Sequence, residues 1–324
     1  MDRRGFIAGS AAAATMLAAL PAPAQDTYPS GAITLINPFP PGGAVDAVAR
    51  PLAGVLEQQL KQSVVIETRP GAAGLVGARY VANAVADGYT LLLHSASLAG
   101  FAEVDRLYGR PVRFTRADFI PIARLIADPM VLIVNGRQPY ATLRDFVDDV
   151  GKRPNQLAYS SSGPHGALHL PMALFLKAAG LEMKHVPTNG GGPALAALLG
   201  NSAQALVSSI AAASAQIRAG KVRALASFGA RRDPAFPDVP TMKEQGYDVE
   251  FYLWVGLFAP KRTAEPIIVR LREEIGRAAA TNEFRQAIKS VGQEVAYMDQ
   301  PEFKAFWDAD ARRVEEAVRQ IGKI

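Results

Sequence analysis

Four glycine-rich turns give this sequence its clearest chemical feature, because each lies between an expected strand and an expected helix. The turns are residues 40–43, 70–74, 163–166 and 189–192. The first amides of a helix have no internal hydrogen-bond partners, and the helix dipole adds partial positive charge there. Glycine leaves these amides uncovered by a Cβ, so such a turn can hold a carboxylate or a phosphate. A single turn of this kind is an ordinary tight connection, but four of them predict an anion site at the carboxyl ends of parallel strands.

Several polar and aromatic residues near these turns allow two interpretations each. The hydroxyls of Ser161, Ser162 and Thr188 are candidate donors to the anion. Asp46 falls in the first turn of the helix after Gly43, where it would either complement the helix dipole and brace the turn or contact the ligand. Trp254 is by default a core residue, and the alternative is a wall against the carbon skeleton of the ligand.

Nucleotide binding and enzyme chemistry find little support in the sequence. No G-x-x-x-x-G-K-[ST] motif is present, and residues 71–77 lack G-x-G-x-x-G spacing. The chain has no cysteine and no G-x-S-x-G elbow. His165 and His169 are four residues apart, but no H-E-x-x-H accompanies them, so we expect packing or capping roles and no metal. A triad of Ser97 or Ser161 with a histidine and Asp46 can be drawn, but spacing alone cannot support it. We predict no cofactor and no enzymatic activity.

The composition and the N-terminus set the class of protein. The chain has 324 residues, 49% hydrophobic, with a net charge of +5 that is scattered and does not form the basic stripe of a nucleic-acid binder. Residues 1–24 combine Arg3-Arg4, an apolar run and the A-x-A-like site 22–24, which predicts a signal peptide of secretory or twin-arginine type. The rest of the chain lacks an apolar run of 18 residues, so we expect an exported protein without a membrane span.

The elements that must position the turns alternate along the chain. Short β-branched runs alternate with longer Ala/Leu-rich helical runs. The expected strands include 33–37, 64–68, 90–94 and 131–134, and the expected helices include 44–60 and 75–86. This alternation predicts an α/β fold with mainly parallel sheets flanked by helices. We expect two lobes, one made of residues 25–124 and 227–324 and the other of residues 125–226. A last helix over 301–321, about 30 Å long at 1.5 Å per residue, should lie as a strap across a lobe.

Several sequence blocks around these turns resemble one protein family. They include Pro38-Phe39-Pro40-Pro41-Gly42-Gly43, Tyr159-Ser160-Ser161-Ser162-Gly163 and Pro237-Asp238-Val239-Pro240-Thr241. In content and order they are similar to the Bug/TctC family of extracytoplasmic substrate-binding receptors, over residues 28 to 320. The resemblance implies a two-lobed Venus-flytrap fold that holds ligand carboxylates in an interlobe cleft.

The resemblance also implies the site and the partners. The ligand-binding residues carried onto this sequence, together with the candidates above, are Pro41, Gly42, Gly43, Asp46, Ser95, Ser97, Ser161, Ser162, Gly163, His165, Gly166, Ala167, Thr188 and Trp254. Ala167 stands where the family usually has a hydroxyl residue. We expect a monomeric periplasmic receptor for a small organic carboxylate that delivers it to a tripartite tricarboxylate transporter. The alternatives are a sensor subunit that presents the ligand to a signalling partner and a periplasmic serine hydrolase.

Overall fold

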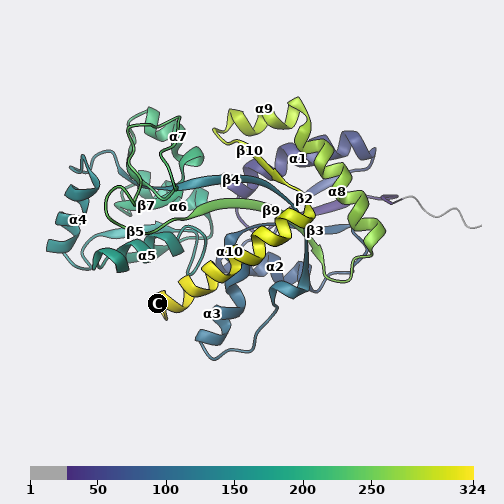
Figure 1. Ribbon diagram of the computed structural model, residues 1–324, viewed down its shortest axis with the longest axis horizontal. Helices are drawn as coiled ribbons and strands as arrows, with labels where there is room; N and C mark the ends of the chain where they lie inside the picture. The colour runs from purple at the N-terminus through teal and green to yellow at the C-terminus, as the bar shows by residue number, and fades with distance from the viewer. Residues whose placement is uncertain (1–27) are drawn as a thin grey trace, which may run out of the picture.

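The computed structural model describes residues 28–324, and the expected signal peptide lies outside them. Two long strands, β4 (Phe119–Asn135) and β9 (Tyr252–Pro260), run through the middle of the molecule (Figure 1). Up to Pro129, β4 pairs antiparallel with β9, and from Met130 onward it pairs antiparallel with β7 (Ala205–Ser209). The chain therefore passes from one sheet region to another near Pro129. We call these two regions, with the helices that cover them, lobe 1 and lobe 2.

Lobe 1 is a mixed sheet covered by helices on both faces. Its remaining strands are β1 (Ile33–Asn37), β2 (Val64–Thr68), β3 (Thr90–Ser95) and β10 (Val295–Met298). β1 pairs parallel with β2 and β3, while β3 and β9 are antiparallel. Leu35 and Leu93 belong to one apolar cluster and Ile36 and Leu92 to another, as expected when successive side chains point to opposite faces of a sheet.

The lobe 1 helices divide between these two clusters. The first cluster contains residues of α1 (Ala44–Leu60), α8 (Glu265–Ala280) and α9 (Asn282–Ser290). The second contains residues of α2 (Leu75–Ala82), α3 (Phe101–Leu107) and α10 (Gln300–Ile321). The layers of the predicted α/β fold are thus present, with parallel outer strands and antiparallel crossing strands.

Lobe 2 surrounds a single apolar cluster. Its strands are β5 (Ala158–Ser161), β6 (Lys184–Pro187), β7, β8 (Val222–Ser227) and the end of β4, and β5 pairs parallel with both β6 and β7. The helices are α4 (Leu143–Lys152), α5 (Leu170–Ala179), α6 (Gly191–Leu199) and α7 (Ile210–Arg218). α4 begins with a capping box, in which Thr142 Oγ1 accepts from the Asp145 amide at 3.1 Å and Asp145 Oδ2 accepts from the Thr142 amide at 2.9 Å.

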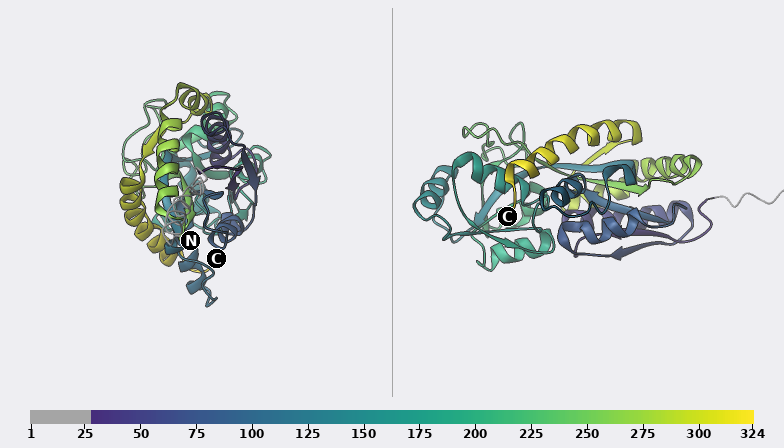
Figure 2. Two further views of the ribbon diagram at one scale, coloured as in Figure 1. Left: turned by 90° about the vertical axis from the view of Figure 1, so that its right-hand side faces the viewer. Right: turned by 90° about the horizontal axis from the view of Figure 1, so that it is seen from below.

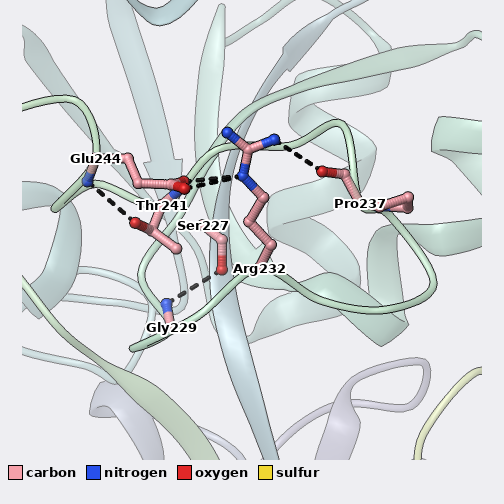
Figure 3. Close-up of polar contacts among 6 residues, drawn as sticks. All are labelled: Ser227, Gly229, Arg232, Pro237, Thr241 and Glu244. Atoms are coloured by element: carbon pink, nitrogen blue, oxygen red, sulfur yellow. Dashed lines mark hydrogen bonds and ion pairs between the residues drawn. The ribbon is translucent and has the colours of Figure 1, made fainter.

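The connection between β8 and β9 is an irregular segment held by polar contacts (Figure 3). Arg232 Nε donates to both carboxylate oxygens of Glu244 at 3.1 and 3.0 Å, and Glu244 Oε2 accepts from the Thr241 amide at 2.7 Å. Phe228 and Met242 from this segment belong to the lobe 2 cluster. The predicted domain boundary at residue 227 stays a prediction. Because Phe228 and Met242 pack in lobe 2, the structure favours a later return of the chain to lobe 1, along β9.

The last helix, α10, is the expected strap, and it runs from lobe 1 toward lobe 2 (Figures 1 and 2). Its end is fastened to both lobes. Lys177 Nζ of lobe 2 donates to the Gln320 carbonyl at 2.6 Å, and Tyr108 OH of lobe 1 donates to the Ile324 carbonyl at 3.0 Å. No helix among residues 28–324 is long and apolar enough to cross a membrane.

Candidate functional site

A small cavity lies where the glycine-rich turns of the two lobes meet, and we call it the inner cavity. Its volume is about 50 Å³, which is room for a few water molecules. The lining residues are Phe39, Gly42, Gly43, Ala44, Val45, Ser95, Ser162, Ala167, Leu168, Gly191, Leu195, Ser208, Ser209, Ala212 and Leu253. The first turn of lobe 1 and the serine-rich turn of lobe 2 therefore share one cavity.

The turns of opposite lobes approach to backbone contact around this cavity. A Cβ added to Gly43 would lie 3.7 Å from the Gly191 amide nitrogen, and one added to Gly163 would lie 3.2 Å from Ala73. A Cβ on Gly190 would lie only 2.8 Å from Pro40 Cδ. Because real Cβ atoms do not approach so closely, at Gly190 the absence of a side chain is what lets the lobes meet.

Three helices begin at the inner cavity. α1 starts after Gly43 and α6 after Gly190, and neither helix has a side-chain cap. α7 starts after Ser209, whose Oγ accepts from the Ala212 amide at 3.2 Å. The uncapped first-turn amides of α1 and α6 need an acceptor, and they carry the positive ends of two helix dipoles from opposite lobes. No charged side chain is among the described residues that line the cavity, so these dipoles supply its positive potential.

Asp46 braces the first turn, which is the structural one of its two interpretations. Its Oδ2 accepts from the Gly42 amide at 3.2 Å and from Arg50 Nε at 3.0 Å, and Arg50 Nη2 lies 3.0 Å from Oδ1. The carboxylate is 6% exposed and does not line the inner cavity. Asp46 therefore fixes the direction of the Gly42 amide, and its ion pair with Arg50 was not predicted from the sequence.

Of the predicted site residues, five line the inner cavity: Gly42, Gly43, Ser95, Ser162 and Ala167. The sequence reasoning missed Ser208 and Ser209, at the junction of β7 and α7, and Leu253 of β9. That junction has no glycine to mark it. The signal that was available is Ser209 itself, a serine at the boundary between a buried strand and a helix.

Other predicted residues lie around the inner cavity and hold its turns in place. Ser161 Oγ lies 2.6 Å from His185 Nε2 and accepts from the Gly163 amide at 3.1 Å. Thr188 Oγ1 lies 2.8 Å from the Ser161 carbonyl oxygen and 2.9 Å from that of Gly190, and its single proton is donated to one of them at a time. Pro41, Gly163 and Gly166 belong to the contact between the lobes, where a Cβ on Gly166 would lie 3.1 Å from Ala73 Cβ.

The histidines of lobe 2 form a buried ring cluster. The centroids of His169 and His185 are 4.4 Å apart, and Tyr159 stacks on His185 at 4.9 Å. His165 Nε2 lies 3.0 Å from the Gly322 carbonyl, which joins the serine-rich turn to the end of α10. Burial lowers the pKa of His169 to about 2 and that of His185 to about 4, so both rings are neutral at pH 7. Among residues 28–324, no group of three or more His, Cys, Asp or Glu is arranged to hold a metal ion.

Trp254 and Ser97 also lie away from the inner cavity. Trp254 is fully buried, donates from Nε1 to Asp310 Oδ2 at 2.8 Å and packs edge-on against Phe303. The default core role of Trp254 is therefore the one the structure supports, and its neighbour Leu253 faces the cavity instead. Ser97 is 1% exposed and lies in the short 3-10 helix Ala96–Gly100 that follows β3.

The sequence as a whole matches one family model. The model describes the tripartite tricarboxylate transporter family receptor, and the match covers residues 48–323. This chain belongs to that family. Among its relatives, the protein BugT of Bordetella pertussis is 34% identical over 92% of this chain and 91% of its own length. The proteins of this family are solute-binding receptors and not enzymes.

Solved structures similar to this one include periplasmic binding proteins. The periplasmic binding protein BugD is 30% identical with a TM-score of 0.83, over 91% of this chain and 98% of its own. MatC from Rhodopseudomonas palustris, solved with bound malate, is 29% identical with a TM-score of 0.82, over 90% of this chain and 100% of its own. The R. palustris protein Rpa4515, solved with adipate, is 28% identical with a TM-score of 0.83, over 91% of this chain and 98% of its own. The predicted two-lobed binding-protein fold is confirmed by these likenesses.

Proposed function

We propose that this protein is a periplasmic solute receptor that captures a small organic carboxylate in the inner cavity and delivers it to a tripartite tricarboxylate-type transporter. It is exported by a signal peptide that is cleaved near Ala24, and it acts as a monomer. Ligand binding holds the lobes together, and the transporter distinguishes the closed, loaded form from the open form.

One observation carries the proposal: uncapped helix N-termini from both lobes open on the same cavity. α1 belongs to lobe 1 and α6 to lobe 2, so both can donate to one carboxylate only while the lobes are together. Each helix-dipole contact contributes about 0.3–1 kcal/mol when exposed and up to about 2 kcal/mol when partly buried. Useful affinity therefore needs several such donors around one anion with water excluded, and the small volume of the cavity meets that need.

The class of ligand follows from the related proteins and from the lining of the inner cavity, in which the described residues supply amides and hydroxyls but no charged side chain. A carboxylate matches bare amides and the hydroxyls of Ser95, Ser162 and Ser208. Two related structures were solved with malate and with adipate, which are both carboxylates. An aromatic or amphipathic carboxylate is the second possibility suggested by Trp254 and Tyr252, but Trp254 packs in the core and Tyr252 OH accepts from the Ala230 amide at 2.9 Å.

The experiment is a thermal-shift screen of the mature chain against carboxylates, with the matching primary amides as controls that keep shape and lose charge. A ligand at 100 times its Kd stabilises the folded state by about 2.7 kcal/mol. For a protein of this size that is a rise of roughly 5 °C in Tm, since 1 kcal/mol is worth about 2–4 °C for 150–250 residues and less for longer chains. The proposal fails if no carboxylate raises the Tm, or if amides raise it equally.

A further inference from the structure

A second pocket adjoins the inner cavity and opens outward between the lobes; we call it the outer pocket. It is lined from α1, α7 and α9, and it shares Gly42, Gly43, Ala44 and Ala212 with the inner cavity. Its volume is about 430 Å³, far more than that of the inner cavity. In Figure 1, α1 and α9 lie on the lobe 1 side and α7 on the lobe 2 side. A ligand anchored at the turn of Gly42 and Gly43 could extend into this pocket.

The outer pocket is closed along one edge by direct contact between the lobes. Gly292, in the turn after α9, has a φ of 81°, and a Cβ added there would lie 2.8 Å from Ser214 Oγ and 3.2 Å from the Ala211 carbonyl of α7. The pocket therefore has its full lining only while the lobes are together. A ligand group bound in it would add to the stability of the closed form.

Gln293 gives this pocket an unsatisfied polar atom. Its side chain lines the pocket, is 2% exposed, and donates from Nε2 to Asp128 Oδ2 at 2.8 Å. This bond fixes the orientation of the amide. Oε1 is left buried with no hydrogen-bond partner within the described part of the chain. A buried acceptor without a donor costs about 1–3 kcal/mol, so a ligand that supplies a donor would recover that loss.

The charges that face the outer pocket select the kind of group that fits. Asp46 and Arg50 both line it, but they form an ion pair with two contacts of 3.0 Å and so contribute no net charge. A second carboxylate would meet the acceptor Oε1 of Gln293 without a free counter-charge. A hydroxyl or an amide N–H would instead donate to Oε1, and its own oxygen could accept from an N–H of Arg50.

We infer that the outer pocket is a second ligand subsite, in which Gln293 accepts a hydrogen bond from a hydroxyl or amide group at the far end of the bound carboxylate. This inference rests on the proposed function, because it takes the carboxylate end to lie in the inner cavity. It adds that the natural ligand is a monocarboxylate with a neutral, hydrogen-bond-donating tail.

The test compares pairs of ligands that differ only in the tail. Isothermal titration at pH 8 measures Kd for butanoate, hexanoate and octanoate, for their ω-hydroxy derivatives and for adipate. We expect at least one hydroxylated acid to bind about tenfold more tightly than its parent, which corresponds to about 1.4 kcal/mol. An added hydroxyl gains nothing in a pocket that lacks a partner for it, so such a gain is diagnostic. The inference is overturned if no hydroxylated acid gains affinity, or if adipate outcompetes every hydroxylated acid.

Two variants test whether Gln293 is the source of the preference for hydroxylated acids. Gln293→Met keeps the length of the side chain and removes both the acceptor Oε1 and the donor to Asp128, so the ratio between the Kd of each parent acid and that of its hydroxylated derivative should fall from about ten to about one. Gln59→Met is the matched control, because Gln59 Oε1 is also buried without a partner among residues 28–324 but Gln59 lines neither the inner cavity nor the outer pocket. Loss of the preference in both variants, or in neither, overturns the inference. If none of these acids binds the wild-type protein and the wider carboxylate screen is also negative, it is the proposed function that fails.

Discussion

A Cβ atom added to Gly192 would lie 2.8 Å from the carbonyl oxygen of Pro41 on the opposite lobe. Gly192 has no positive φ, so the backbone conformation is compatible with alanine. The added methyl group would clash only at the contact between the lobes. We therefore expect Gly192→Ala to disfavour the closed form and to leave each lobe folded. An overpacking cost of about 1–3 kcal/mol should weaken ligand binding by about 5- to 150-fold.

Titration calorimetry with the ligand found by the screen, together with the radius of gyration from X-ray scattering, measures this effect. Gly54→Ala is the control, since a Cβ there meets nothing within 4 Å and the residue lies in the middle of α1. Alanine at that position should stabilise the fold by about 0.5–1 kcal/mol and leave Kd unchanged. Wild-type affinity in Gly192→Ala would show that closure at this contact is not needed for binding.

Asp46→Ala should destabilise the first turn and weaken binding indirectly. The substitution removes the acceptor of the Gly42 amide and the partner of Arg50, which are charged hydrogen bonds worth about 1.5–3 kcal/mol. Urea unfolding gives the loss of stability and calorimetry gives the loss of affinity. Asp148→Ala is the control, because Asp148 forms an exposed ion pair with Arg144 at 3.8 Å and the same four-residue spacing. The control should change stability by less than about 0.5 kcal/mol, and an equal loss in both variants would contradict the bracing role.

The sequence predicted the elements that carry strong local signals and missed those that depend on partners. The bounds of α1 and β1 were predicted as observed, because a glycine turn separates an apolar run from a long helical pattern. β4 was expected only over residues 131–134. Its first part contains Pro121, Arg124 and Asp128, and its pairing with β9 shifts register near the first two, so no strand alternation is visible there. β10 is a short irregular edge strand with no fully buried residue, and it too was missed.

In the candidate site, too, the residues with a local sequence signal were predicted and those placed by tertiary packing were missed. Glycine turns drew attention to Gly42, Gly43 and the loop of Ser162, and these residues line one cavity because each follows the carboxyl end of a parallel strand in its own lobe and the two lobes meet there. Ser208, Ser209 and Gln293 could not be found in that way. They come from a turn without glycine and from a residue after α9 whose position depends on how the lobes pack.

Asp128 should make the stability of the protein fall as the pH rises toward neutrality. Burial raises the pKa of Asp128 from 3.8 to about 7. Between about pH 4 and pH 7 the folded chain therefore keeps a proton that the unfolded chain has released, so this group lowers the free energy of unfolding as the pH rises through that range. The free energy of unfolding falls by at most about 4 kcal/mol, and the fall is complete above pH 7. Asp128→Asn has no titrating group at this position and should not show this fall.

Urea unfolding of the wild type and of Asp128→Asn at several pH values between 4.5 and 8 isolates this effect as a difference curve. His169 and His185, whose pKa values are lowered, give the opposite slope below pH 6.5, but both proteins contain them and their contribution cancels. A difference between the two proteins that does not change with pH would show that Asp128 is ionised throughout, with Gln293 sufficient to stabilise its charge.

Trp254→Phe should lower stability and leave ligand binding unchanged, because Trp254 belongs to the core and not to the inner cavity. The substitution removes the donor at 2.8 Å from Asp310 Oδ2, a buried carboxylate whose pKa burial already raises, and it leaves a small void beside Phe303. We expect a loss of about 1–3 kcal/mol in urea unfolding. Trp307→Phe is the matched control, since Trp307 is also buried but its Nε1 has no partner within residues 28–324, so its loss should be smaller. If Trp254→Phe instead raised Kd without changing stability, the indole ring would have to contact the ligand, and the assignment of the aromatic cluster to the core would be wrong.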